Sequence, residues 1–341
     1  MTNQDTVRGR TGPTGPADTP ETVTAADPAD PADAAAPVGP VGPADGRERP
    51  DLSARWDSEP LDLAAYLERI GYDGPLEPTF DTLRALQSAH LEAIAFEGLN
   101  PYLGLPVPLD IGSLQDKMVY GRRGGYCHEQ NTLFGTVLDR LGFHVTGRNA
   151  RMLMGADERV VTARGHAILS VVIDGTDWHV DVGIGNVGPR GPIPLAEGAQ
   201  VFTGPWEYRM ERTDLGHWLL RYRRPQDGEW FNVVQFTEEV HYRSDYADAN
   251  IIAATHGSSP ITRQPIVAHN GDRVRYALSG RTLNTYLPNG EKSTRELGAE
   301  DVPGALRSEF GIHLTEEQAD ELVRRLGAPS GAAAETAPAD L

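Results

Sequence analysis

The sequence has a single cysteine, Cys127, among its 341 residues. One cysteine excludes an internal disulfide and any zinc or iron–sulfur site built on several thiols, and no metal site is predicted. A thiol that takes part in chemistry here must act without a second thiol.

Long uncharged apolar runs are also missing. No stretch approaches the roughly 18 to 20 apolar residues that a membrane helix needs, and the first residues lack the apolar core of a secretory signal. These features predict a soluble, cytoplasmic protein without a membrane partner.

Basic residues are fewer than acidic ones. The chain has 31 Lys and Arg residues against 49 Asp and Glu residues, which gives a formal net charge of -18. Such an acidic chain is not expected to bind nucleic acid, and an anionic substrate would need a local group of positive charges.

The composition divides the chain into a body and two tails. Residues 1–50 hold nine of the 26 prolines and no aromatic residue. Such a segment cannot bury enough apolar surface to offset the entropy lost on ordering. Residues 1–50 and 328–341 are therefore predicted to be disordered tails.

Within the body, the spacing of apolar residues changes along the chain. Helical spacing covers 51–142 and is strongest in the stretch after Cys127. Short strands separated by turn signals fill 143–242, a pattern typical of a barrel or a sandwich. Helices and strands mix over 243–327. The predicted fold class is α+β.

The only thiol lies in the segment Gly121–Asn131, where a glycine-rich loop runs into a predicted helix. A thiol at a helix N-terminus faces unpaired backbone N–H groups and the positive end of the helix dipole, and both favour the thiolate. The segment is typical of a nucleophile. A lone cysteine is more often a small buried core residue, and that interpretation stays open, although a core position does not require the paired Gly124 and Gly125.

A nucleophilic thiol needs a base within hydrogen-bond reach and a carboxylate that orients this base. His166 opens one predicted strand, and Asp181 lies in the returning strand. If Asp174 pairs with Asp177 across the turn, the two side chains share a face of the sheet. The same register puts Asp181 opposite Ser170, about 13 Å from His166 at about 3.3 Å per residue. The pair therefore stays undecided, since a bulge or a longer loop would be required.

Several segments together resemble the arylamine N-acetyltransferase family, over about residues 57 to 326. Its signatures are an Arg-Gly-Gly-aromatic-Cys helix start, a strand that begins with His, and an Asp-Val-Gly-Phe-Gly turn. The separations of 39 and 15 residues between the Cys, His and Asp positions also match. The matching segments are RRGGYCHEQN (122–131), GHAILSVVIDG (165–175), WHVDVGIG (178–185), IAFEGLN (94–100) and SPIT (259–262).

The resemblance implies Cys127 as the nucleophile that carries an acyl thioester, His166 as its base and Asp181 as the group that orients the base. It also implies three parts: an N-terminal helical bundle that carries the nucleophile, a central β-barrel that carries His166 and Asp181, and a C-terminal α/β lid. The Cys-His-Asp arrangement would be similar to that of the cysteine proteases.

The implied reaction moves an acetyl group from acetyl-CoA to Cys127 and then to an arylamine or arylhydrazine, in a ping-pong sequence. No permanently bound cofactor is implied. Arg263 and Arg281 are candidate partners for the CoA phosphates.

Other functions stay open on the same residues. Some relatives with this fold are amide synthases that close macrolactams, and the donor could be another acyl-CoA or a carrier-bound acyl group. A Cys-His-Asp hydrolase or protease would hydrolyse the acyl-enzyme without an amine. A non-catalytic binding module is a further alternative, against which the complete Cys-His-Asp set argues.

Phe96, Gly183 and Ile184 are expected to line the substrate pocket. Three positions depart from the family pattern: Ile184 and Ile261 stand where the family has phenylalanine, and Gly98 stands where it has asparagine. These departures predict an acceptor pocket that is wider or less aromatic than usual.

Other residues near these motifs have simpler interpretations. Arg123 and Glu97 match family positions that imply a structural ion pair bracing the cysteine loop. His128 follows the thiol, but as the next helical residue it is expected to project away from it and to be solvated or structural. His179 is expected to serve strand pairing. The run Gly183–Gly188 fits a dinucleotide fingerprint, but the prolines after it forbid the required helix.

Overall fold

The structure is a computed structural model that describes residues 56–328. The tails predicted over 1–50 and 328–341 lie outside this range, apart from Ala328. Within the described range, no helix combines the length and the apolar character that crossing a membrane requires.

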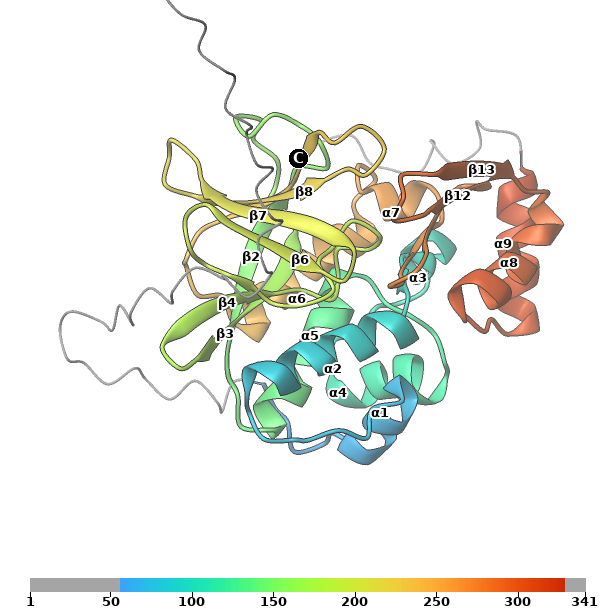
Figure 1. Cartoon of the computed structure of the whole chain (residues 1–341). Helices are drawn as coiled ribbons and strands as arrows, with labels where there is room; N and C mark the ends of the chain where they lie inside the picture. The colour runs from blue at the N-terminus through green and yellow to red at the C-terminus, as the bar shows by residue number, and fades with distance from the viewer. Residues whose placement is uncertain (1–55, 329–341) are drawn as a thin grey trace, which may run out of the picture. The chain divides into compact units, whose positions relative to one another are not determined.

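Helices form the first part of the described chain, as the spacing predicts (Figure 1). Most of their apolar side chains meet in one core that includes Leu83, Leu86, Leu133 and Phe134, while Leu99, Tyr102 and Leu103 belong to a second core with residues of the last part of the chain. The elements are α1 (Leu63–Ile70), α2 (Phe80–Ala93), α3 (Leu99–Leu103), α4 (Ile111–Leu114), a π-helical turn (Gln115–Tyr120) and α5 (Cys127–Arg140).

Helix α5 is the most deeply buried of these helices. Every residue from Cys127 to Leu138 is buried, because α5 packs against strands of the barrel as well as against α4 and α6. The sequence predicts an apolar stripe on this helix, but the polar side chains at its start are buried too. Its first turn therefore contributes polar groups to the interior.

The strands of the middle part form one antiparallel sheet in the order β5-β4-β3-β2-β9-β8-β7-β6. The end strands β5 and β6 lie in contact, so the sheet curls into a nearly closed barrel. Of the two predicted architectures, the barrel is thus observed. The strands are β2 (His144–Met152), β3 (His166–Ile173), β4 (Thr176–Val180), β5 (Ile193–Pro194), β6 (Ala199–Thr203), β7 (Trp206–Arg212), β8 (Trp218–Arg223) and β9 (Trp230–Phe236).

The last part mixes helices with a second antiparallel sheet, in the order β1-β10-β11-β12-β13. Strand β1 (Phe96–Glu97) comes from the helical part and pairs with β10, with Phe96 opposite Ala268. This pairing joins the chain beside the cysteine loop to the second sheet. The remaining elements are α6 (Arg243–Thr255), α7 (Pro260–Arg263), β10 (Ile266–Asn270), β11 (Arg275–Ser279), β12 (Thr282–Tyr286), β13 (Lys292–Glu296), a 3-10 turn (Ala299–Asp301), α8 (Val302–Phe310) and α9 (Glu316–Gly327).

Candidate active site

The loop before Cys127 is packed tightly against β1. The Glu97 N–H donates to the Gly125 carbonyl at 3.0 Å. A side chain at position 124 would collide with the Ala95 carbonyl oxygen, so only glycine fits there. The Gln130 amide donates to the carbonyls of Ala95 and Gly125, at 3.0 Å each. These contacts fix the point at which α5 begins, and with it the position of the thiol.

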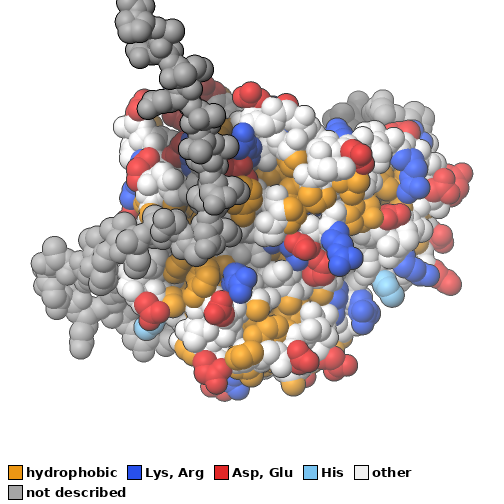
Figure 2. Space-filling model, in the orientation of Figure 1, with side chains coloured by type: hydrophobic (Ala, Val, Ile, Leu, Met, Phe, Trp, Pro, Cys, Tyr) orange, Lys and Arg blue, Asp and Glu red, His pale blue; other side chains and the backbone are white. Residues whose placement is uncertain are grey.

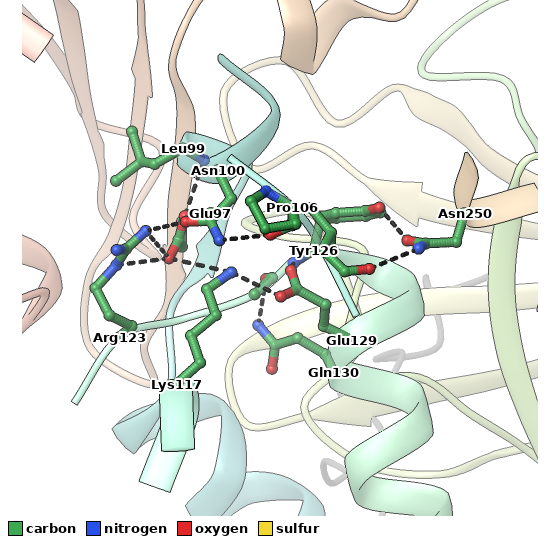
Figure 3. Close-up of polar contacts among 12 residues, drawn as sticks. Glu97, Leu99, Asn100, Pro106, Lys117, Arg123, Tyr126, Glu129, Gln130 and Asn250 are labelled. Atoms are coloured by element: carbon green, nitrogen blue, oxygen red, sulfur yellow. Dashed lines mark hydrogen bonds and ion pairs between the residues drawn. The ribbon is translucent and has the colours of Figure 1, made fainter. Parts of the chain in front are cut away.

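Four charged side chains lie behind this loop and form what we call the ion quartet: the buried Arg123, Glu97 and Glu129 and the partly buried Lys117 (Figure 3). Arg123 Nη2 lies 2.7 Å from Glu97 Oε1, and Lys117 Nζ lies 2.7 Å from Glu129 Oε1 and 3.6 Å from Glu97 Oε1. The sequence pointed to Arg123 and Glu97 but not to the other two residues. The quartet sets two basic side chains against two acidic ones, three of the four being buried.

Glu97 and Glu129 also bind the backbone. Glu129 accepts a hydrogen bond from the Tyr126 N–H at 3.0 Å, and Glu97 accepts one from the Leu99 N–H at 2.8 Å. Burial raises the pKa of the Glu129 carboxyl, and Lys117 offsets this only in part. The ion quartet thus holds the residue before the thiol as well as the loop.

Cys127 is the only free thiol and is buried at the start of α5. Burial raises the pKa of this thiol, but the imidazoles of His128 and His166 outweigh burial and lower the pKa from 9.0 to about 5. The side chain is therefore a thiolate near neutral pH, which is the nucleophilic form of cysteine.

His166 and Asp181 form a buried pair, with 2.7 Å between His166 Nε2 and Asp181 Oδ2. Burial lowers the pKa of His166, but Asp181 and Cys127 overcome this and raise it to about 10. Burial raises the pKa of Asp181, yet the facing imidazole brings it below its usual value. His166 is thus an imidazolium beside the thiolate, held by a carboxylate on its far side.

The pair meets because the β3–β4 turn differs from the predicted one. Ile173 pairs with Thr176, so the two-residue turn is Asp174-Gly175, with φ of 49° and 78°. Two positive φ values belong to the type I′ turn, which favours Asp-Gly. The predicted pairing of Asp174 with Asp177 is therefore wrong by one residue on each strand.

The observed register shortens the distance between the two side chains. Leu169 pairs with Val180, so Asp181 follows β4 at the level of Ile168, about 7 Å along the strand from His166 rather than about 13 Å. The shift keeps both side chains on the same face, as parity predicted. No bulge or longer loop is needed.

Asn131 holds Asp181 in place, a role that the sequence interpretation missed. Its amide donates to Asp181 Oδ1 at 2.9 Å, and its carbonyl oxygen accepts from the Val182 N–H at 3.1 Å. Asn131 lies four residues after Cys127, so both point from one face of α5. The spacing of four residues between Cys127 and Asn131, within the segment RRGGYCHEQN, is the sequence feature that could have indicated this role.

Gly183 lies against the backbone of Cys127. A Cβ at this position would lie 2.5 Å from the Cys127 Cα and 2.8 Å from the Asn131 amide nitrogen. Glycine therefore lets the segment after β4 reach the start of α5. The Gly183 N–H also donates to Asp181 Oδ1 at 2.7 Å.

A small apolar group surrounds the thiol and includes Phe96, Val107, Tyr126 and Ile261. Ile184 is instead buried in the barrel core. Phe96 therefore packs against the apolar group that contains the thiol, whereas Ile184 belongs to the barrel core.

The space beside Gly98 is occupied. A Cβ at this position would lie 2.7 Å from Ile261 Cβ, so Ile261 fills the room that the missing side chain leaves. The absence of a side chain at Gly98 does not widen the surroundings of the thiol at this point.

His128 differs from the expectation. It is fully buried, and its Nδ1 lies 3.5 Å from Cys127 Sγ. It is therefore neither solvated nor turned away from the thiol. His179 lies in β4 and pairs with Ser170 of β3. Its ring stacks on that of Phe236, with 5.2 Å between the ring centroids.

No cluster of three or more His, Cys, Asp or Glu side chains within residues 56–328 is arranged to hold a metal ion.

The structure is similar to solved N-acetyltransferases. It superposes on the arylamine N-acetyltransferase from Mycobacterium abscessus with a TM-score of 0.77 at 33% identity, covering 82% of this chain and 100% of that one. The enzyme from Mycobacterium marinum in complex with CoA gives a TM-score of 0.73 at 34% identity, with 78% and 98% covered. The fold is that of an N-acetyltransferase.

Sequence comparison agrees. A family model described as N-acetyltransferase matches residues 79–319. The arylamine N-acetyltransferase of Mycolicibacterium smegmatis is 38% identical over 258 residues, which cover 74% of this chain and 93% of that protein. The resemblance seen in the sequence is confirmed, and the chain belongs to the arylamine N-acetyltransferase family of acetyltransferase enzymes.

Proposed function

We propose that this protein transfers an acetyl group from acetyl-CoA to an arylamine or arylhydrazine through a thioester on Cys127. The observation that carries the proposal is a buried thiol of low pKa at the start of α5, beside an imidazole that is bonded to a carboxylate. Such a group attacks a carbonyl without first having to lose a proton.

In the first step, the Cys127 thiolate attacks the thioester carbonyl of acetyl-CoA. Backbone N–H groups at the start of α5 are suitable donors for the oxyanion that forms. The new bond joins Cys127 Sγ to the acetyl carbon, and the bond between that carbon and the CoA sulfur breaks. The proton on His166 goes to the departing CoA thiolate.

In the second step, the amine attacks the acetyl carbon and the bond to Cys127 Sγ breaks. Aromatic amines and hydrazines are weakly basic, so they are unprotonated at neutral pH and can attack directly. His166 takes the proton that the nitrogen releases, with Asp181 stabilising the imidazolium. The thiolate and imidazolium are thereby restored.

Two groups of residues are proposed to bind the substrates. Phe96, beside the thiol, offers an aromatic surface to the acceptor. Arg263 and Arg281 are both exposed and are candidates for binding the CoA phosphates. Arg281 Nη2 also lies 3.6 Å from Glu296 Oε1. CoA is bound in the Mycobacterium marinum relative, which supports it as the donor here.

Intact-mass analysis after mixing with several acyl-CoAs tests this proposal. We expect a gain of one acetyl group, located on Cys127 by peptide mapping and removed when an aromatic amine is added. The Cys127→Ser variant, folded to the same extent, is the control and should gain no thioester. A wild-type protein that takes no acyl group from any CoA thioester would contradict the proposal and favour a carrier-bound donor.

A further inference from the structure

The thiol contacts two imidazoles that reach it from different elements. His166 comes from β3, and its charge and hydrogen bonding act on the thiol. His128 comes from α5 itself, with its Nδ1 3.5 Å from Cys127 Sγ. The acetyl transfer described above uses only the first of them.

The surroundings of His128 leave its second ring nitrogen without a partner. The ring lies between Tyr126 and Tyr246, at centroid distances of 5.8 Å and 5.9 Å and near right angles to both. Both hydroxyls bind elsewhere, Tyr126 to Asn250 and Tyr246 to the Ile168 carbonyl. Among residues 56–328, His128 Nε2 is buried with no hydrogen-bond partner.

This asymmetry selects one tautomer of the ring. A proton on Nε2 would leave a buried N–H group without an acceptor, and the Nδ1 lone pair would face the negative sulfur. A proton on Nδ1 instead gives a donor directed at Cys127 Sγ and leaves Nε2 as an unprotonated atom between aromatic ring edges. The second arrangement costs less, because Nε2 has no partner in either one and only the second forms a hydrogen bond between Nδ1–H and the sulfur.

We propose that His128, held as its Nδ1–H tautomer, donates a hydrogen bond to the Cys127 thiolate. This inference rests on the proposed function in taking Cys127 as the nucleophile. His128 then stabilises the thiolate through this N–H group. His166, paired with Asp181, supplies the opposite charge.

The other ionisable groups that face the thiol do not replace this donor. Tyr126, just before α5, and Tyr246, from α6, both have a hydroxyl pKa raised by burial and by nearby negative charge, so they stay neutral. Their rings, not their hydroxyls, lie against His128. Behind His166, Asp181 is bonded to the imidazole and to Asn131.

The pH dependence of thiol alkylation in the full chain tests the proposal. The rate of reaction of Cys127 with iodoacetamide follows its thiolate fraction and needs no acetyl-CoA. We expect His128→Phe, which keeps a ring between the two tyrosines but has no N–H, to raise the midpoint by about one to two pH units. We expect His128→Asn, whose amide N–H can replace the Nδ1 donor, to stay near the wild-type midpoint.

Each outcome decides the question. A His128→Phe midpoint equal to that of the wild type would overturn the proposal, as would equal shifts in the Phe and Asn variants, which would indicate a packing role. If His128→Phe does not fold, nitrogen NMR of the wild type decides: an Nδ1–H signal supports the proposal and an Nε2–H signal refutes it. Acetyl loading measured by intact mass tests the proposed function separately.

Discussion

At the scale of single residues, the pKa values of Cys127 and His166 define the pH range in which the site is active. The thiolate forms above the Cys127 pKa of about 5, and the imidazolium persists below the His166 pKa of about 10. We therefore expect the rate of acetyl loading to fall as the pH drops through about 5, to stay level near neutrality, and to fall again toward 10. The burst of CoA release, measured against pH, tests this. A midpoint near 9, the value of an ordinary thiol, would contradict it.

Gly183 gives a second prediction at this scale. The Cβ of Gly183→Ala would lie 2.5 Å from Cys127 Cα, so the segment after β4 or the start of α5 must move. Overpacking of this kind typically costs about 1 to 3 kcal/mol of unfolding free energy. We expect lower stability and a large loss of acetyl loading, measured by denaturant unfolding and by CoA release.

The matched control is Gly165→Ala, next to His166, where a Cβ meets nothing within 4 Å. This variant should keep both stability and loading rate close to the wild type. If Gly183→Ala and Gly165→Ala have equal stability and equal rates of acetyl loading, the contact between Gly183 and Cys127 does not affect function.

The residues that the sequence interpretation missed share a physical reason. Lys117, Asn131 and the inward position of His128 depend on contacts between segments that are far apart in the chain or on how a helix face is buried. Helical periodicity predicts an exposed polar side of α5, but the barrel covers that side as well. The roles of these three residues were therefore not predicted, although His128 and Asn131 lie within the quoted motif.

At the scale of elements, the ion quartet joins β1, the cysteine loop and α5. Removing the Glu97 carboxylate leaves the buried Arg123 without its ionic partner, while Lys117 keeps Glu129. Breaking a buried ion pair typically costs about 3 to 5 kcal/mol. We expect Glu97→Gln to lower the unfolding free energy by that order and to slow acetyl loading. Denaturant unfolding measures the first effect and CoA release the second.

Asp81→Asn removes a carboxylate from an exposed pair with Arg84 and serves as the control. Exposed pairs contribute little, so this variant should barely change the stability. A Glu97→Gln protein that is as stable as Asp81→Asn would show that the quartet does not brace the loop.

The β3–β4 hairpin shows how far sequence reasoning reaches at this scale. Alternation places His166 and Asp181 on one face, and the structure agrees. The register was wrong because both Asp174-Gly175 and Gly175-Thr176 can form a two-residue turn, and only the first uses the Asp-Gly preference for two positive φ values. A shift of one residue on each strand changed the expected distance by about 7 Å at about 3.3 Å per residue.

At the scale of the whole molecule, the proposed function requires one thiol to serve both substrates. Initial rates with acetyl-CoA and an aniline should therefore give parallel double-reciprocal lines, because CoA leaves before the amine reacts. Intersecting lines would require both substrates to be bound together and would favour direct transfer over a Cys127 thioester.

The net charge and the visible face of the molecule offer no broad attraction for an anionic donor. The chain carries a net charge of -18, and Figure 2 shows acidic and basic side chains interspersed, with apolar patches between them. Recognition of CoA phosphates must then depend on a few local groups rather than on long-range steering.

The burial of α5 affects how this protein loses activity when it is heated. Its first turn carries Cys127, and one turn later Asn131 holds Asp181, while the whole segment packs between the barrel and the helices. Cys127 lies on this buried helix rather than on a loosely attached loop. We therefore expect the site to unfold together with the core and not before it. Catalytic half-life and loss of tertiary structure should follow the same temperature curve, which would make residual activity a direct measure of the fraction of molecules still folded.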